Sequence, residues 1–148
     1  MACYTNNPYA KSCVRTYNNT SQPTTVTGVI LALGNTVVDS GVSIGIGTSG
    51  FTIKGSGLYH LAADVTYLAP AATSEVVSTV EVLLTKDGVV LPCADSKASM
   101  RSSGYTTIHV ETDLVIPTCR MSQPVIAVQV LGAVGTITHV CAGVTKLA

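Results

Sequence analysis

Two glycine-rich motifs in the first third of the chain have spacings that serve chemistry in enzymes. Residues 41–45 read Gly-Val-Ser-Ile-Gly, the spacing of a hydrolase nucleophile elbow, and residues 45–50 read Gly-Ile-Gly-Thr-Ser-Gly, the spacing of a dinucleotide-binding loop. Both mechanisms need a helix directly after the motif. Residues 51–57 instead continue as a glycine-rich, strand-like segment. We therefore expect the glycines to form a tight loop or bulge between strands.

The histidines could bind a metal ion or act as bases. His60, His109 and His139 occupy polar positions of strand-like segments, and His109 shares its face with Glu111 and Asp113. No loop dense in Asp and Glu supports a metal site on this face. We expect these side chains to be solvated or to lie at an interface, and we expect no enzyme activity, no metal and no cofactor.

The cysteines are five in number and include no CxxC pair: Cys3, Cys13, Cys93, Cys119 and Cys141. An odd count argues against a complete disulfide framework, and the spacing argues against a zinc knuckle. Cys3 and Cys13 could form a bridge, and free thiols are the alternative. Cysteines within apolar segments are expected to behave as small hydrophobic residues.

The composition indicates a chain that associates with other chains. Apolar residues make up 47% of the 148 residues and charged residues only 11%, with a formal net charge of zero, whereas an ordinary domain has about 25% charged residues. We infer that part of the surface is buried against other copies. No apolar run approaches the roughly 20 residues of a membrane-spanning helix. The scattered basic residues give no support for nucleic-acid binding.

The elements that must position these residues are predicted to be strands. Apolar and polar residues alternate over 58–68, 79–85 and 107–116, a period of two that is typical of half-buried antiparallel strands. Asp87-Gly88 favours a tight hairpin between two of them. With turn signals every 8–12 residues, the pattern predicts that residues 26–148 form one all-β domain, an antiparallel two-sheet sandwich or jelly roll.

Two runs break this alternation, at residues 29–33 and 125–131, because both of their faces are apolar. In a sandwich, one face of such a strand would lie in the core and the other against a neighbouring subunit. The candidates for an oligomer interface are therefore Val29, Leu31, Leu33, Ile126, Val128 and Val130.

Residues 1–25 differ from the rest of the chain because they are polar and contain almost no aliphatic residues. Such a segment cannot bury enough apolar area to fold alone. We expect an extended arm that docks on a partner through Tyr4, Tyr9 and Tyr17, and a mobile terminus is the alternative.

Seven positions fall on one long spacing: Leu33, Asp39, Ile44, Phe51, Gly57, Tyr59 and Leu61. This pattern resembles the signature of the tumour-necrosis-factor/complement-1q globular head. The sequence departs from that signature with Leu33 and Leu61 where Phe is usual, Ile44 where an aromatic or Leu is usual, and Ala63 for a final aromatic. The resemblance implies a ten-strand jelly roll that forms a homotrimer, with Phe51, Gly57, Tyr59 and Leu61 as fold-motif core residues.

The resemblance also suggests a function. A head with a short polar arm, and without collagen-like repeats, looks like the minimal versions of this domain in bacteriophage virions. The expectation is a structural virion protein: a homotrimeric capsid decoration or head fibre on the virion surface, assembled in the host cytoplasm and attached to the major capsid protein or another virion protein through residues 1–25. The alternative is a receptor- or glycan-binding head of a tail fibre or of a bacterial or spore surface protein.

Overall fold

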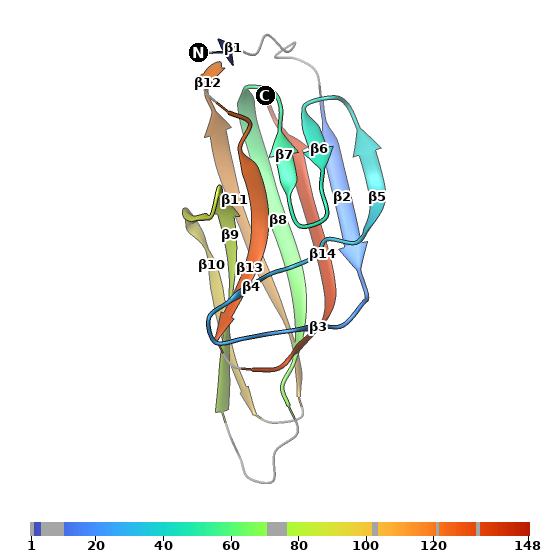
Figure 1. Ribbon diagram of the computed structural model, residues 1–148, viewed down its shortest axis with the longest axis vertical. Helices are drawn as coiled ribbons and strands as arrows, with labels where there is room; N and C mark the ends of the chain where they lie inside the picture. Colours follow the sequence, from blue (N-terminus) through green and yellow to red (C-terminus); the bar gives the residue numbers. More distant parts are fainter. Residues whose placement is uncertain (1, 4–10, 71–76, 102–103, 121, 133) are drawn as a thin grey trace.

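The computed structural model describes residues 2–3, 11–70, 77–101, 104–120, 122–132 and 134–148. Two six-stranded antiparallel sheets pack face to face, which confirms the predicted all-β jelly-roll sandwich (Figure 1). The first, the β8 sheet, contains β11 (Tyr105–Ile116), β8 (Gly57–Leu68), β14 (Thr136–Lys146), β2 (Cys13–Asn18), β5 (Asn35–Ser40) and, beside β14, β3 (Gln22–Pro23). The second, the β9 sheet, contains β10 (Val89–Arg101), β9 (Val77–Lys86), β13 (Val125–Gly132), β7 (Phe51–Ile53), β6 (Ile44–Ile46) and, beside β13, β4 (Val29–Ile30). A small ladder pairs β1 (Ala2–Cys3) with β12 (Cys119–Arg120).

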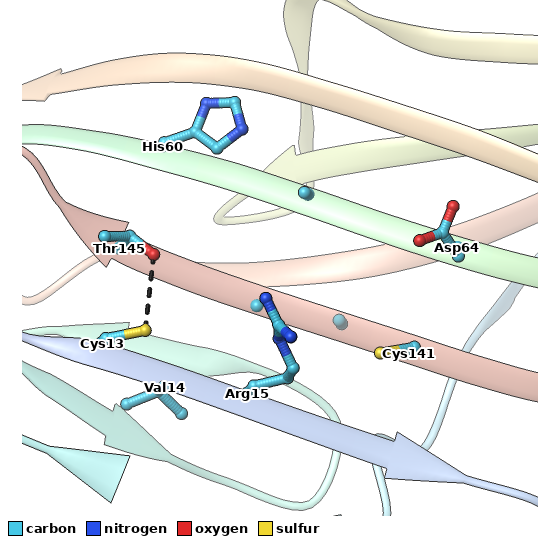
Figure 2. A pocket seen from close by; sticks show the side chains of 10 residues that line it. Cys13, Val14, Arg15, His60, Asp64, Cys141 and Thr145 are labelled. Atoms are coloured by element: carbon cyan, nitrogen blue, oxygen red, sulfur yellow. Dashed lines mark hydrogen bonds between the residues drawn. The ribbon is translucent and has the colours of Figure 1, made fainter. Parts of the chain in front are cut away.

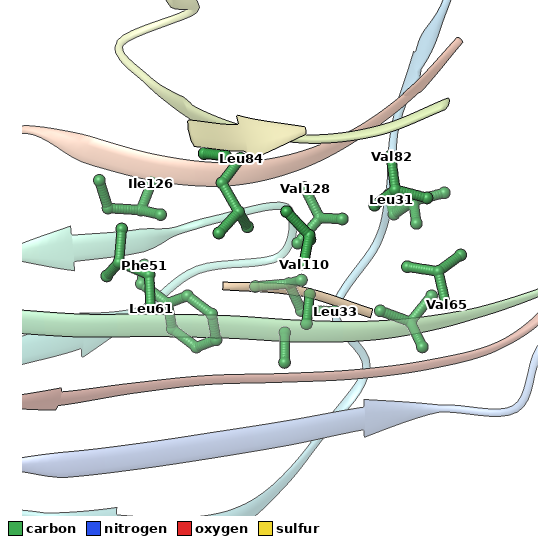
Figure 3. Close-up of a cluster of buried hydrophobic side chains, with 14 of the residues drawn as sticks. Leu31, Leu33, Phe51, Leu61, Val65, Val82, Leu84, Val110, Ile126 and Val128 are labelled. Atoms are coloured by element: carbon green, nitrogen blue, oxygen red, sulfur yellow. The ribbon is translucent and has the colours of Figure 1, made fainter. Parts of the chain in front are cut away.

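The core lies between the two sheets and follows from the alternation in the sequence. Every second residue of β8 is at most 1% exposed, from Tyr59 to Tyr67, while the residues between them are half-buried. Leu84 of β9 and Val128 of β13 approach from the other sheet (Figure 3). Burying such side chains supplies most of the driving force for folding, at roughly 25 cal/mol per Å² of apolar surface.

Three of the four fold-motif residues lie in the core, and the fourth, Gly57, begins β8. Phe51, Tyr59 and Leu61 belong to the buried cluster, and the Tyr59 hydroxyl donates to the carbonyl of Gly55 over 2.7 Å. Gly57 has a φ of +143°, and a Cβ there would lie 2.2 Å from the carbonyl oxygen of Ala148. Only glycine therefore fits at the start of β8 without displacing the C-terminus.

The predicted hairpin is also present. Asp87 and Gly88 have φ values of +50° and +83°, as a type I′ turn requires, and Lys86 pairs with Val89 across it. The Asp87 carboxylate accepts from the amide of Val125 over 2.9 Å, which ties the turn to β13.

The glycine motifs perform none of the chemistry that their spacing could serve. Ser43 is fully buried, and β6 follows it where a nucleophile elbow would need a helix. Residues 45 and 46 belong to β6, and residues 47–50 form the turn between β6 and β7, closed by a hydrogen bond from the amide of Gly47 to the carbonyl of Gly50. Within the described part of the chain there is no helix, and hence none long and apolar enough to cross a membrane.

The predicted interface residues do not lie at the surface. Five of the six are at most 2% exposed and lie within the core: Leu31, Leu33, Ile126, Val128 and Val130. The sixth, Val29, packs against the core. Buried residues cannot contact another subunit, so the assignment is wrong for these five residues, whereas Val29 is half-buried. The segment at 29–33 instead runs beside β13, where the amide of Leu31 donates to the carbonyl of Val128. The second face of β13 is partly closed within the chain itself, because Ala127 is 8% exposed.

The boundary predicted at residue 25 is also wrong. Strand β2 lies between β14 and β5, and its Val14 is 1% exposed in the core. Gln22 and Pro23 pair with β14 as well. The folded head therefore includes residues from 11 onward, and Ala2 and Cys3 also pair with β12. Tyr17 lies on the outer face of β2 and is 37% exposed, whereas Tyr4 and Tyr9 lie outside the described residues.

Candidate interaction face

The outer face of the β8 sheet, turned away from the core, holds most of the ionisable residues that the sequence singled out. Strand register sets their positions, since residues that pair directly across an antiparallel ladder share a face. Asp113 lies opposite His60, and His109 lies opposite Asp64. We call this surface the β8 outer face; its central members are Arg15, His60, Ala62, Asp64, His109, Glu111, Asp113, Cys141 and Gly143.

Two histidines and three carboxylates form a continuous chain across β8 and β11. His60 Nδ1 lies 2.8 Å from Asp113 Oδ1, and His109 Nδ1 lies 2.7 Å from Asp64 Oδ1. The Nε2 atoms of the two rings lie 3.4 and 3.3 Å from the same oxygen, Oε2 of Glu111. Both nitrogens of each ring therefore face a carboxylate, an arrangement that we call the His–carboxylate chain.

The protonation state of the two rings decides whether the contacts of the His–carboxylate chain are energetically favourable. A neutral imidazole carries one N–H, so its second nitrogen turns a lone pair toward a carboxylate oxygen, whereas an imidazolium donates from both nitrogens. The hydrogen bond to Asp64, and then that to Glu111, raise the pKa of His109 against an opposing desolvation effect. The arrangement thus favours the protonated, charged form of His109.

A hollow of about 290 Å³ opens beside the His–carboxylate chain, between β2, β14 and β8 (Figure 2). Ala62 and Gly143, which present almost no side chain, belong to its lining. Arg15, His60 and Asp64 border the same hollow (Figure 2). Arg15 passes near Gly143, since a Cβ added at Gly143 would lie 3.8 Å from the Nε of Arg15. A protruding side chain from another molecule could enter this space.

Three of the cysteines are free thiols, at positions 13, 93 and 141. Cys13 contacts Thr145, with 3.5 Å between Sγ and Oγ1 (Figure 2). Cys13 is therefore not bridged to Cys3, and the free-thiol alternative holds for it. No group of three or more metal-ligating side chains in the described part of the chain is arranged to hold a metal ion.

The opposite surface, the outer face of the β9 sheet, has a second hollow of about 400 Å³. Ile30 and Val125 border it and are 51% and 42% exposed. Its remaining lining comes from the β6–β7 turn, from the Asp87-Gly88 hairpin and from Thr52, Thr85 and Ala127 on the strands. This hollow is more apolar and contains no histidine.

The sequence placed His109, Glu111 and Asp113 on one face, and the structure confirms this. It also placed His60 at a polar position of its strand, and the structure confirms this as well. Sequence reasoning missed the proximity of the two groups, because the register between β8 and β11 brings them together. It missed Arg15 as well, since β2 was interpreted as part of an arm.

Known proteins resemble this chain in structure and not in sequence. No family model matches the chain, and no curated protein does. Among solved structures, murine APRIL aligns with a TM-score of 0.67 at 11% identity, covering 93% of this chain and 99% of the other. The fold is that of the tumour-necrosis-factor/complement-1q jelly roll. The globular domain of zebrafish complement 1qA has a TM-score of 0.61 at 11% identity, covering 93% and 98%. Eiger TNF from S. frugiperda has 0.60 at 11%, covering 96% and 94%.

Proposed function

We propose that the chain is a homotrimeric head domain that serves as a structural virion protein, a capsid decoration or head fibre on the virion surface. The fold carries the proposal, because it matches the jelly roll that the sequence signature implies. The low charge content supports burial of surface between copies.

The β8 outer face is the surface through which we propose that copies associate. Its two halves have opposite charge: Arg15 lies on β2, and the carboxylates lie on β8 and β11 beyond β14. In a cyclic arrangement, one patch of each copy meets a different patch of the next. The Arg15 side of one copy then faces the acidic side of its neighbour, and a neighbouring side chain can fill the hollow over Ala62. Charge complementarity thus selects a second copy of this chain as the occupant.

Attachment to the particle is assigned to the residues that precede β2. The sequence predicts that residues 1–25 are a docking arm for the major capsid protein or another virion protein. Because residues 2–3 pair with β12 and residues from 11 onward belong to the head, the proposed docking segment shortens to residues 4–10, which contain Tyr4 and Tyr9.

The test is to localise the chain on particles. Virions purified from a culture that carries the gene are labelled with an antibody against residues 26–148 and viewed by electron microscopy. We expect label on the outside of intact particles, and none when the antibody is first absorbed with purified protein. Antibody that finds the protein only in the particle-free fraction would contradict the virion role.

A second candidate is a receptor- or glycan-binding head of a tail fibre or of a bacterial or spore surface protein. The hollow on the β9 sheet favours it, because apolar Ile30 and Val125 lie close to the Asp87 carboxylate. Ligand sites typically combine an apolar lining with a few polar groups. Binding of the purified head to a glycan array, lost in Val125→Asp and retained in Val115→Asp on the other sheet, would support this function.

A further inference from the structure

We propose that assembly through the β8 outer face is coupled to proton uptake by the His–carboxylate chain, so that the trimer is tightest in mildly acidic solution and loosens as the pH rises. This inference rests on the proposed homotrimer and adds its regulation. Its basis is the geometry of the His–carboxylate chain, in which two rings serve three carboxylates.

The charge count of the face shows why protons matter. With both rings neutral, Asp64, Glu111 and Asp113 contribute three negative charges against the single positive charge of Arg15. With both rings protonated, the positive and negative charges are equal in number. The groups facing the two rings come from every neighbouring strand: Asp64 of β8, Glu111 and Asp113 of β11, Thr145 and Cys141 of β14, and Cys13 and Arg15 of β2.

In a monomer, the excess negative charge on the β8 outer face is only slightly unfavourable, because water solvates the charged side chains. The side chains of His60 and His109 are 37% and 52% exposed, and that of Glu111 is 57% exposed. Ion pairs in such surroundings contribute about 0–1 kcal/mol. Another copy on this face removes the water. A desolvated carboxylate that lacks a donor is then strongly unfavourable, whereas one that accepts from an imidazolium is compensated.

The consequence is thermodynamic linkage. If association leaves more protons bound, the association constant must rise as the pH falls. Each of the three copies brings two rings, so several protons act on one equilibrium. Uptake of only one proton per trimer gives about a tenfold change in the association constant per pH unit. Imidazoles exchange protons between about pH 5 and 8, which sets the window.

His139 provides an internal control. It lies on β14, and its ring contacts Asn19 through Nδ1 and makes no ion pair with a carboxylate in the described part of the chain. A substitution there removes a histidine from the same sheet while leaving the His–carboxylate chain intact.

The experiment is sedimentation equilibrium of the full chain from pH 5.5 to 8.0, at constant ionic strength and with EDTA present. We expect the trimer association constant to fall at least about tenfold per pH unit. The double variant H60Q/H109Q should lose most of this dependence, and H139Q should retain it. In E111Q, the oxygen that both Nε2 atoms face no longer carries a full charge, so association at pH 8.0 should strengthen relative to wild type.

The outcomes separate the two proposals. A monomer at every pH would overturn the homotrimer itself. A trimer whose association constant does not change with pH would leave the homotrimer standing and overturn the proton linkage. The same pH dependence in H60Q/H109Q as in wild type would also overturn it, because other groups would then take up the protons. Circular dichroism of each variant at both pH limits confirms that the comparison is made between folded chains.

Discussion

On one side of strand β8, Tyr59, Leu61 and Val65 are at most 1% exposed, while on the other side His60 and Asp64 have side chains that are 37% and 49% exposed. Adjacent residues of one strand thus belong to two regions with opposite chemistry. The inner region is closed and apolar, and its packing determines the fold. The outer region is ionisable and hollowed, and it is free to meet another molecule. We infer that stability depends on the first and association on the second.

The largest expected effect compares two leucines on the two faces. Replacing Leu61 by Ala removes methyl groups from a closely packed core and should lower the free energy of unfolding by about 2–5 kcal/mol. Leu58 is half-buried on the outer face, so Leu58→Ala should cost about 1 kcal/mol or less. Urea denaturation of both variants checks this. Equal losses would mean that the outer face is as tightly packed as the core.

A second comparison concerns the start of the strand. Gly57→Ala combines an unfavourable φ with a Cβ 2.2 Å from the Ala148 carbonyl, and we expect a loss of about 2–3 kcal/mol. Gly88 also has positive φ, at +83°, but a Cβ there meets no atom within 4 Å. Gly88→Ala should therefore cost about 1 kcal/mol, from backbone strain alone. Thermal unfolding that ranks the two variants in reverse would refute the role assigned to Gly57.

A third change should stabilise the protein. The hydroxyl of Thr16 is buried on the inner face of β2 and makes no hydrogen bond with any described residue. Thr16→Val removes this unsatisfied group and should raise the free energy of unfolding by about 1 kcal/mol. On the outer face, the Thr66 hydroxyl lies 3.0 Å from that of Thr107, so Thr66→Val should bring no gain. Chemical denaturation distinguishes the two, and destabilisation by Thr16→Val would indicate an unseen partner.

The smallest effect is the pH dependence of stability on the outer face. Since the pKa of His109 is raised by Asp64 and Glu111, its contribution is fully present below the unfolded value of about 6.5 and disappears as the pH rises through the folded pKa. His109 is exposed, so the contribution should be less than about 1 kcal/mol. Measured at protein concentrations where the chain is monomeric, His109→Gln should flatten the decline in stability between about pH 6 and 8, whereas His139→Gln should not. An unchanged slope in His109→Gln would contradict the assignment.

The sequence predicted the inner region better than the outer one. Alternation over 58–68 and 107–116 identified both long strands and their buried faces, because burial imposes a period of two wherever one face meets the core. The register between these strands is set by contacts distant in sequence, and the pairing of His60 with Asp113 depends on it.

Two errors have physical causes. The inner face of β2 carries Thr16 and Asn18 beside Val14, so the strand has too few aliphatic residues to be distinguished from a polar arm. The runs at 29–33 and 125–131 were apolar on both faces, and this was interpreted as an intersubunit contact. The residues named for that contact lie on the core face of each run, and the second face of β13 is only partly closed within the chain, because Ala127 is 8% exposed and Val125 is 42% exposed.

The most direct test of the central claim is the native mass of the purified chain when one outer face or the other is blocked. Ala62→Trp adds bulk to the lining of the hollow on the β8 outer face, and Thr79→Trp adds the same bulk to the exposed outer face of β9. At pH 6, we predict that wild type and Thr79→Trp sediment at three times 15.2 kDa and that Ala62→Trp sediments as a folded monomer. A wild-type monomer, or an Ala62→Trp trimer as stable as wild type, would contradict association through this face.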